Sequence, residues 1–383
     1  MRASSLARRQ LLHQRRRLFV ALAGVAFAVL LMLMQLGFRT ALFASAVRFH
    51  SHLEGDVFLV SPRSVYLAQM QSFTSRRLYQ ALGLPGVEWV SPVYTAVALW
   101  KNPFNGMTRR IFVAAFDPSK RTIDIDGVTA QLDTLPHPDV ALFDEASRPD
   151  YGPVAETFRQ RGSLHVEVED RDIQIVGLFH LGTSFGIDGN LITSDLNFLR
   201  IFPKHEEGLI QIGVVHLAPG ADPQAVRDAL AAALPHDVDV LTRAAFMERE
   251  ITYWASATPI GFVFTFGAIM GFVVGMVIVY QILFADVSEH LAEYATLKAM
   301  GYRDGYLFFV VLYQAIILAV LGFIPGLLVS LQLYKVTANA THLPMNLTPQ
   351  IGAFILGLTM VMCMLSGLIA VRKVRSADPA EVF

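Results

Sequence analysis

Four long stretches without a charged residue place the strongest constraint on how this chain can fold. They are Leu18–Phe38, Pro259–Phe284, Tyr306–Leu333 and Ile351–Val371. About 20 consecutive apolar residues cross the hydrocarbon core of a bilayer as a helix, so each stretch is long enough to span a membrane. Only 16% of the residues are charged, whereas about a quarter are charged in a soluble domain. The sequence therefore predicts an α-helical membrane protein with four transmembrane helices.

The distribution of basic residues predicts how these helices are oriented. Six arginines and no acidic residue precede the first stretch, and lysine and arginine accumulate on the cytoplasmic side of membrane helices. Both termini are therefore expected in the cytoplasm, with the protein in the inner (cytoplasmic) membrane. The predicted segments are 1–17 (cytoplasmic), 18–45 (helix one), 46–255 (extracytoplasmic domain), 256–285 (helix two), 286–304 (cytoplasmic loop), 305–334 (helix three), 335–350 (external loop), 351–371 (helix four) and 372–383 (cytoplasmic tail).

The large external segment reads as an α+β domain. Strands and helices are expected in the order strand, helix, strand, strand at 56–60, 72–86, 87–100 and 109–116, then strand, helix, strand at 209–217, 222–234 and 237–242. Between these two units, residues 117–207 contain an alternating hairpin that turns near Asp170-Arg171 and several turn-rich stretches. We interpret the segment as a sandwich of two halves with a β-rich insertion.

Charge and motifs exclude several functions for the external segment. Residues 46–255 hold 26 Asp and Glu against 18 Lys and Arg, a net charge of −8, which is unfavourable for binding nucleic acid. The sequence contains no G-x-x-x-x-G-K-[ST] phosphate loop and no H-E-x-x-H motif. The single cysteine, Cys363, cannot form an intrachain disulfide. We therefore expect no nucleic-acid partner and no enzyme acting alone.

Three weaker patterns favour ordinary structure over chemistry. The pair His50 and His52 is too small a ligand set for a metal, so exposed polar residues are the expected interpretation. The acids of 144–150 and 167–172 are expected to form a solvated acidic surface. The segment 182–186 (GTSFG) matches the nucleophile-elbow pattern, but turn residues follow it where that motif needs a helix. We expect a glycine-rich loop there, with no catalytic and no metal-binding residue.

Small residues and a proline mark the predicted membrane helices. Gly267, Gly271 and Gly275 are spaced four apart and share one face of helix two, and Gly24 provides a similar surface on helix one. Such faces allow close packing, either within one chain or between two copies. Pro325 in helix three lacks a backbone N–H and is expected to kink that helix.

The loop between helices two and three contains a charged helix. Asp286 with Glu289 fits a capping box, and Gly301 fits the residue that ends a helix, which predicts a helix over Val287–Met300. Its possible interpretations are a solvated linker or a docking surface for a cytoplasmic partner. The residues expected to face that partner are Glu289, Glu293, Thr296, Leu297, Met300 and Gly301.

The sequence of this loop resembles MacB/FtsX-type ABC permeases, and the whole chain resembles the DevC branch most. The similar segments include VEWVSPVY, FDEASRPDYGP, DGNLITSDLNFLRIFP, VYQILFADVSEHLAEYATLKAMGY and RKVRSADPAEVF. The resemblance implies a porter-like external domain with an inserted subdomain and a homodimer in the lipid membrane. It also implies two copies of a separate ABC ATPase subunit that bind ATP and Mg, so that this chain carries no cofactor. In the DevC branch, which is cyanobacterial, a membrane-fusion adaptor and a TolC-like outer-membrane protein complete the pump.

The mechanism that the resemblance implies is mechanotransmission. The partner ATPase moves the coupling helix Val287–Met300, and the external domain then moves on cargo such as glycolipid. An FtsX-like signalling permease, a lipoprotein-extracting permease and a receptor without an ATPase remain alternatives. The sequence does not identify the cargo.

Overall fold

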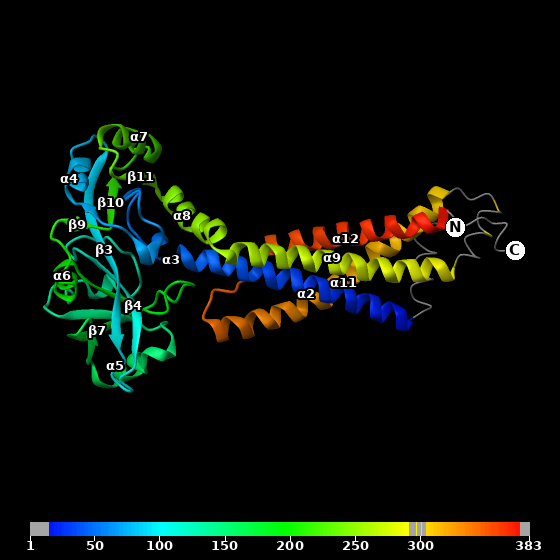
Figure 1. The fold of residues 1–383 in the computed structure, drawn as a ribbon, viewed down its shortest axis with the longest axis horizontal. Coiled ribbons are helices and arrows are strands. Elements are labelled where there is room, and N and C mark those ends of the chain that lie inside the picture. Colours follow the sequence, from blue (N-terminus) through cyan, green and yellow to red (C-terminus); the bar gives the residue numbers. More distant parts are fainter. Residues whose placement is uncertain (1–14, 291–295, 297–299, 301–303, 376–383) are drawn as a thin grey trace. The chain divides into compact units, whose positions relative to one another are not determined.

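The computed structural model describes residues 15–290, 296, 300 and 304–375 (Figure 1). The described chain divides into two compact units. The helical unit comprises residues 15–41, 259–340 and 345–375, and the sheet unit comprises residues 42–258 and 341–344.

The helical unit contains the apolar stretches that the sequence predicts to cross a membrane. Among the described residues, four helices are long and apolar enough to do so. They are α2 (Arg15–Ala46), α9 (Pro259–Glu289), α11 (Asp304–Thr341) and α12 (Pro349–Arg375) (Figure 1). Buried aliphatic residues from all four helices form their common core, for example Val25, Leu283, Leu318 and Met362.

The end of α9 differs from the sequence prediction. Asp286 was expected to cap a new helix, but α9 continues through it to Glu289, and the N–H of His290 donates to the carbonyl of Asp286 at 3.1 Å. A capping residue must lie outside the helix that it caps, so Asp286 and Glu289 do not form the predicted capping box. Neither glycine nor proline interrupts 276–290, so the apolar helix continues into the polar segment.

The strands of the sheet unit are mostly short. They are β1 (Val57–Val60), β2 (Phe73–Thr74), β3 (Val87–Lys101), β4 (Thr108–Phe116), β5 (Val140–Asp144), β6 (Leu164–Val168), β7 (Arg171–Phe179), β8 (Asn190–Ser194), β9 (Leu209–Ile210), β10 (Ile212–Leu217) and β11 (Asp239–Thr242). In the described part of the chain, nine of them form one sheet in the order β11-β1-β10-β3-β4-β8-β5-β7-β6. The strands β2 and β9 pair separately.

The long strand β3 joins two parts of this sheet. Its first half pairs with β10, its second half pairs with β4, and its last residues Trp100 and Lys101 pair with Val168 and Glu167 of β6. Because β6 is also the last strand of the order, these pairings close the described strands β3, β4, β8, β5, β7 and β6 into a ring. The segment 117–207 thus supplies strands to the same sheet rather than forming a sheet of its own.

Helices cover both faces of the sheet. In β1, Val57 and Leu59 face one core while Phe58 and Val60 face the other, as alternation along a strand requires. The first core is covered by α4 (Arg76–Leu82), α5 (Val154–Arg161), α6 (Asp195–Ile201) and α7 (Pro223–Ala233). The second core is covered by α3 (Arg48–Ser51) and α8 (Arg243–Thr252).

Short helical turns complete the unit. They are η1 (Leu67–Gln69), η2 (Thr129–Gln131), η3 (Pro149–Tyr151) and the π-helix η4 (Tyr253–Ala257), which follows α8 directly.

Candidate functional site

The last turn of α9 carries the polar contacts that connect it to two other helices. The Asp286 carboxylate accepts a hydrogen bond from the Gln314 side chain of α11 at 3.0 Å, and Gln314 is fully buried. The Glu289 carboxylate forms an ion pair with Arg17 of α2. This end of α9 is therefore tied to both α2 and α11, in the segment that leads into the predicted coupling region.

The predicted coupling residues are described only in part. Glu289, Thr296 and Met300 are exposed, and the N–H of Met300 donates to the carbonyl of Thr296 at 3.0 Å. Glu293, Leu297 and Gly301 lie outside the described residues. The docking role of this set therefore stays a prediction.

The predicted glycine face of α9 packs against helices of the same chain. A Cβ at Gly267 would lie 2.5 Å from the Gln35 side chain of α2, and a Cβ at Gly271 would lie 3.2 Å from Leu31 Cβ. A Cβ at Gly275 would lie 2.5 Å from Ala28 Cβ. In return, a Cβ at Gly24 of α2 would lie 2.5 Å from Ile278 of α9. These glycines allow the backbones of α2 and α9 to approach closely within one chain.

A second close contact, between α11 and α2, was not predicted. A Cβ at Gly326 would lie 2.8 Å from the Ala26 carbonyl oxygen, and one at Gly322 would lie 2.6 Å from Val25. The Tyr334 hydroxyl donates to the Leu33 carbonyl at 2.6 Å. Pro325 stands between the two glycines, and α11 is helical on both sides of it. The two glycines on either side of Pro325, Gly322 and Gly326, are the sequence feature from which this contact could have been predicted.

The sheet unit does not assemble the enzyme-like patterns into a catalytic site. After Ser184 the chain forms a turn, in which the Ser184 N–H donates to the Ile187 carbonyl at 2.9 Å, and strand β8 follows. A nucleophile elbow needs a helix at that point. No group of three potential metal ligands was found among the residues that the structure describes.

Two polar residues that we expected on the surface are buried. Asp144 is 0% exposed, and its carboxylate accepts from the backbone N–H groups of Leu181 and Gly182 and from the Asn190 side chain at 2.7–3.1 Å. The prediction of a solvated acid was therefore wrong for Asp144, which instead fixes the loop before β8. His50 is 1% exposed, so the surface interpretation was also wrong for this histidine.

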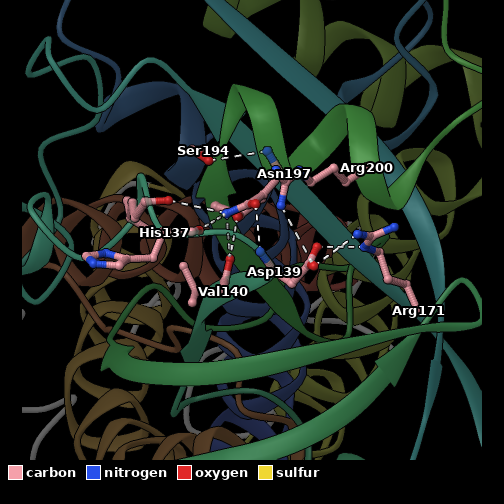
Figure 2. A network of polar contacts seen from close by, with 9 residues as sticks. His137, Asp139, Val140, Arg171, Ser194, Asn197 and Arg200 are labelled. Atoms are coloured by element: carbon pink, nitrogen blue, oxygen red, sulfur yellow. Dashed lines mark hydrogen bonds and ion pairs between the residues drawn. The ribbon is translucent and has the colours of Figure 1, made fainter.

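A further polar network holds α6 against the starts of β5 and β7 (Figure 2). The Asp139 carboxylate accepts two hydrogen bonds from Arg171 at 2.6 and 2.9 Å, and it lies 3.8 Å from Arg200 of α6. The backbone N–H of Asp139 donates to the Asn197 side chain at 2.9 Å. The hydrogen bonds from Arg171 hold the pKa of Asp139 below its usual value.

Asn197 extends this network across α6 and β5. Its side-chain amide donates to the carbonyls of Leu135, His137 and Val140, and its backbone N–H donates to the Ser194 hydroxyl that caps α6 (Figure 2). The network therefore fixes the orientation of α6 with respect to the β6–β7 hairpin.

The comparisons with known proteins assign the chain to a family. Residues 18–233 match the family model described as MacB-like periplasmic core domain, which is more than half of the chain. Residues 265–379 match the model described as FtsX-like permease C-terminal. The chain belongs to the MacB/FtsX-like family of ABC-transporter permeases. Permeases of this family work with ABC ATPase partners, and the four apolar helices make this one a multi-pass inner-membrane protein.

Solved structures with weak overall similarity accompany this assignment. The periplasmic region of MacB from Actinobacillus actinomycetemcomitans is 9% identical, with a TM-score of 0.36 over 52% of this chain and 94% of that chain. The extracellular domain of the noncanonic ABC-type transporter YknZ from Gram-positive bacteria is 14% identical, with a TM-score of 0.33 over 49% and 99% of the two chains. A domain of a putative permease from Porphyromonas gingivalis is 15% identical, with a TM-score of 0.30 over 50% and 89%. A comparison with curated proteins gave no match. The family assignment rests on the two family models.

Proposed function

We propose that this MacB/FtsX-like permease is the membrane subunit of an ABC efflux pump of the DevABC type. It acts as a homodimer with two copies of a separate ATPase chain, which binds ATP and Mg. A membrane-fusion adaptor and a TolC-like duct carry the cargo onward, with glycolipid as a candidate. The observation that carries the proposal is that both permease family models match one chain whose sequence lacks a phosphate loop.

In this mechanism the permease transmits force. The basic N-terminal segment keeps both termini in the cytoplasm, so the loop after α9 faces the ATPase. The contacts of Asp286 with Gln314 and of Glu289 with Arg17 support the proposal, because they link the base of that loop to α11 and α2. A displacement of the loop then moves three helices together, and α2 and α9 lead in sequence into residues 42–258 of the sheet unit.

A charge reversal in the loop tests this proposal. Glu293→Arg is expected to abolish copurification of an ABC ATPase with the detergent-solubilised permease, or to reduce permease-stimulated ATP hydrolysis at least tenfold, a loss of about 1.4 kcal/mol. Membrane insertion should be unchanged. The matched control is Glu206→Arg, the same reversal at an exposed position of the sheet unit, which should leave both readouts intact. Unchanged copurification and unchanged hydrolysis for Glu293→Arg would refute the docking role of the loop.

A further inference from the structure

A cavity of about 460 Å³ opens in the sheet unit. Its lining residues Asp170, Phe198 and Ile201 are sequence neighbours of residues in the network of Figure 2. Its lining comes from the α6 helix with the loop that follows it, from the β6–β7 turn, and from Ala96 of β3. This volume is within the range of small-molecule sites in proteins.

The network of Asp139 keeps the turn and α6 in a fixed relation. Arg171 directly follows Asp170 of the turn, and Arg200 directly precedes Ile201 of α6. Both arginines contact the Asp139 carboxylate, so one acidic side chain holds the turn and the helix together. A site with walls that are fixed before binding loses little conformational entropy when a ligand enters.

The lining combines an apolar surface with acidic groups. Phe198 and Ile201 line the cavity and are buried, and Phe202 is half-buried. The β6–β7 turn contributes Glu169 and Asp170, both with left-handed backbone angles, φ 49° and φ 61°. Lys204 adds one positive charge, and none of the ion pairs among the described residues involves Lys204 or either acid.

Hydrogen bonds to β3 hold Glu169 in place. Its backbone N–H donates to the Leu99 carbonyl at 3.0 Å, and its Oε1 accepts from the Leu99 N–H at 2.7 Å. The second carboxylate oxygen has no hydrogen-bond donor within the described part of the chain. Three other cations lie near the turn, and each already pairs with another acid. Arg171 and Arg200 contact Asp139, and Lys101, which also interacts with Asp170 electrostatically, pairs with Glu167. Among the residues that line the cavity, the two acids of the turn therefore exceed the single Lys204.

We propose that this cavity binds an amphiphile whose head carries an ammonium group. The ammonium lies between Glu169 and Asp170, where charge-assisted hydrogen bonds or ion pairing favour a cation, and the apolar body covers Phe202 and Ala96. An anionic head of the same size would meet two carboxylates and would be excluded.

The test uses the full chain in lipid nanodiscs, without an ATPase, so that its result does not depend on transport. The probes are octyltrimethylammonium, octyl sulfate and octyl glucoside, each titrated below its micelle concentration. Hydrogen exchange read by mass spectrometry measures protection of residues 168–171 and 196–205. Octyltrimethylammonium is expected to slow exchange in both segments at a concentration at least tenfold lower than the other two probes.

Variants separate the charge from the shape of the site. Asp170→Asn keeps a residue type that tolerates the left-handed backbone, and Glu169→Gln keeps an acceptor for Leu99 N–H. Each should weaken the trimethylammonium probe about tenfold. The control Asp172→Asn removes an equal charge two residues after Asp170, outside the cavity lining, and should leave binding of the trimethylammonium probe unchanged.

Phe202→Ala tests the apolar contact and should weaken the trimethylammonium probe about tenfold as well. Equal protection by octyl glucoside, absence of protection by any probe, or unchanged binding by both charge variants would overturn the proposal.

Discussion

Replacing His50 by glutamine is expected to make the stability of the sheet unit pH-dependent. The side chains of His50 and Glu250 are 1% and 6% exposed, and their Nε2 and Oε2 atoms lie 3.7 Å apart. The Glu250 carboxylate accepts from the N–H of Leu67 and from the indole N–H of Trp254, both at 2.9 Å. Burial lowers the pKa of His50 from 6.5 to about 3 and raises the pKa of Glu250 from 4.5 to about 7. The pair is therefore neutral between these values, with its proton on Glu250.

The native pair hides the pH dependence of each member. At pH 4.5–6.5 the unfolded chain holds one proton on this pair, on the histidine, and the folded chain also holds one, on the glutamate. Equal proton numbers give no slope of stability against pH. Without His50, the folded chain keeps the Glu250 proton up to about pH 7 while the unfolded chain releases it near 4.5. Stability should then fall by up to 1.36 kcal/mol per pH unit over that window, about 3 kcal/mol in all.

Tryptophan fluorescence isolates the unit in which this change occurs. The three tryptophans of the chain, Trp89, Trp100 and Trp254, all belong to the sheet unit. Urea unfolding of the full-length His50→Gln protein in nanodiscs, at steps from pH 4.5 to 8, gives the free energy of unfolding. The control is His52→Gln, which removes the neighbouring half-buried histidine that contacts the Asp124 carbonyl at 2.7 Å. A flat profile for His50→Gln between pH 4.5 and 7 would refute the proposed proton assignment.

Two further substitutions test packing and buried polarity. Gly271→Leu should lower the stability of the helical unit by about 1–3 kcal/mol, because the larger side chain forces α2 and α9 apart. The loss is measured as a lower midpoint of thermal unfolding. Gly357→Leu is the control, because no described atom lies within 4 Å of its Cβ position. Asp144→Asn should lower the free energy of unfolding by about 2–4 kcal/mol in the tryptophan-monitored experiment, because the new NH2 group would face the N–H donor of Leu181 or Gly182. The control Asp150→Asn, at an exposed position, should lower it by less than 1 kcal/mol. Equal effects of a variant and its control would contradict the corresponding packing or hydrogen-bond argument.

Capping and turn residues in the sequence correctly predicted the helices and hairpins whose ends are set by neighbouring residues. The helix from Asp222-Pro223 is α7, with Pro223 in its first turn and the Asp222 side chain accepting from the Gln224 N–H. The hairpin predicted near Asp170-Arg171 turns at Glu169 and Asp170, as the left-handed backbone of both residues shows. In each case the side chain or backbone preference acts within three residues, so one sequence contains the necessary information.

The pairing of strands that lie far apart in the sequence could not be predicted from these local signals. The closure of β3 onto β6 joins Trp100 with Val168, and β4 lies parallel to β8. Alternation of polar and apolar residues shows that a segment is a strand, but it does not select the partner strand. The segment 117–207 could therefore be recognised as β-rich, while its continuity with the main sheet could not.

The polar networks of the sheet unit could not be predicted for a related reason, and the proposed cavity depends on one of them. Asp144 and Asn197 are ordinary turn residues in the sequence, and the partners that hold them inside the protein lie 37–62 positions away. The partly exposed Asp139 likewise binds Arg171, 32 positions away. A charged or amide group is stable inside the protein only when such partners are present, so its burial follows from the strand order and cannot precede it. Once the ring of strands is closed, Asp139 and Asn197 hold α6 to the β6–β7 turn. The acidic cavity is therefore a consequence of the strand pairing, and a variant that opens the β3–β6 contact should lose the ammonium site even with Glu169 and Asp170 intact.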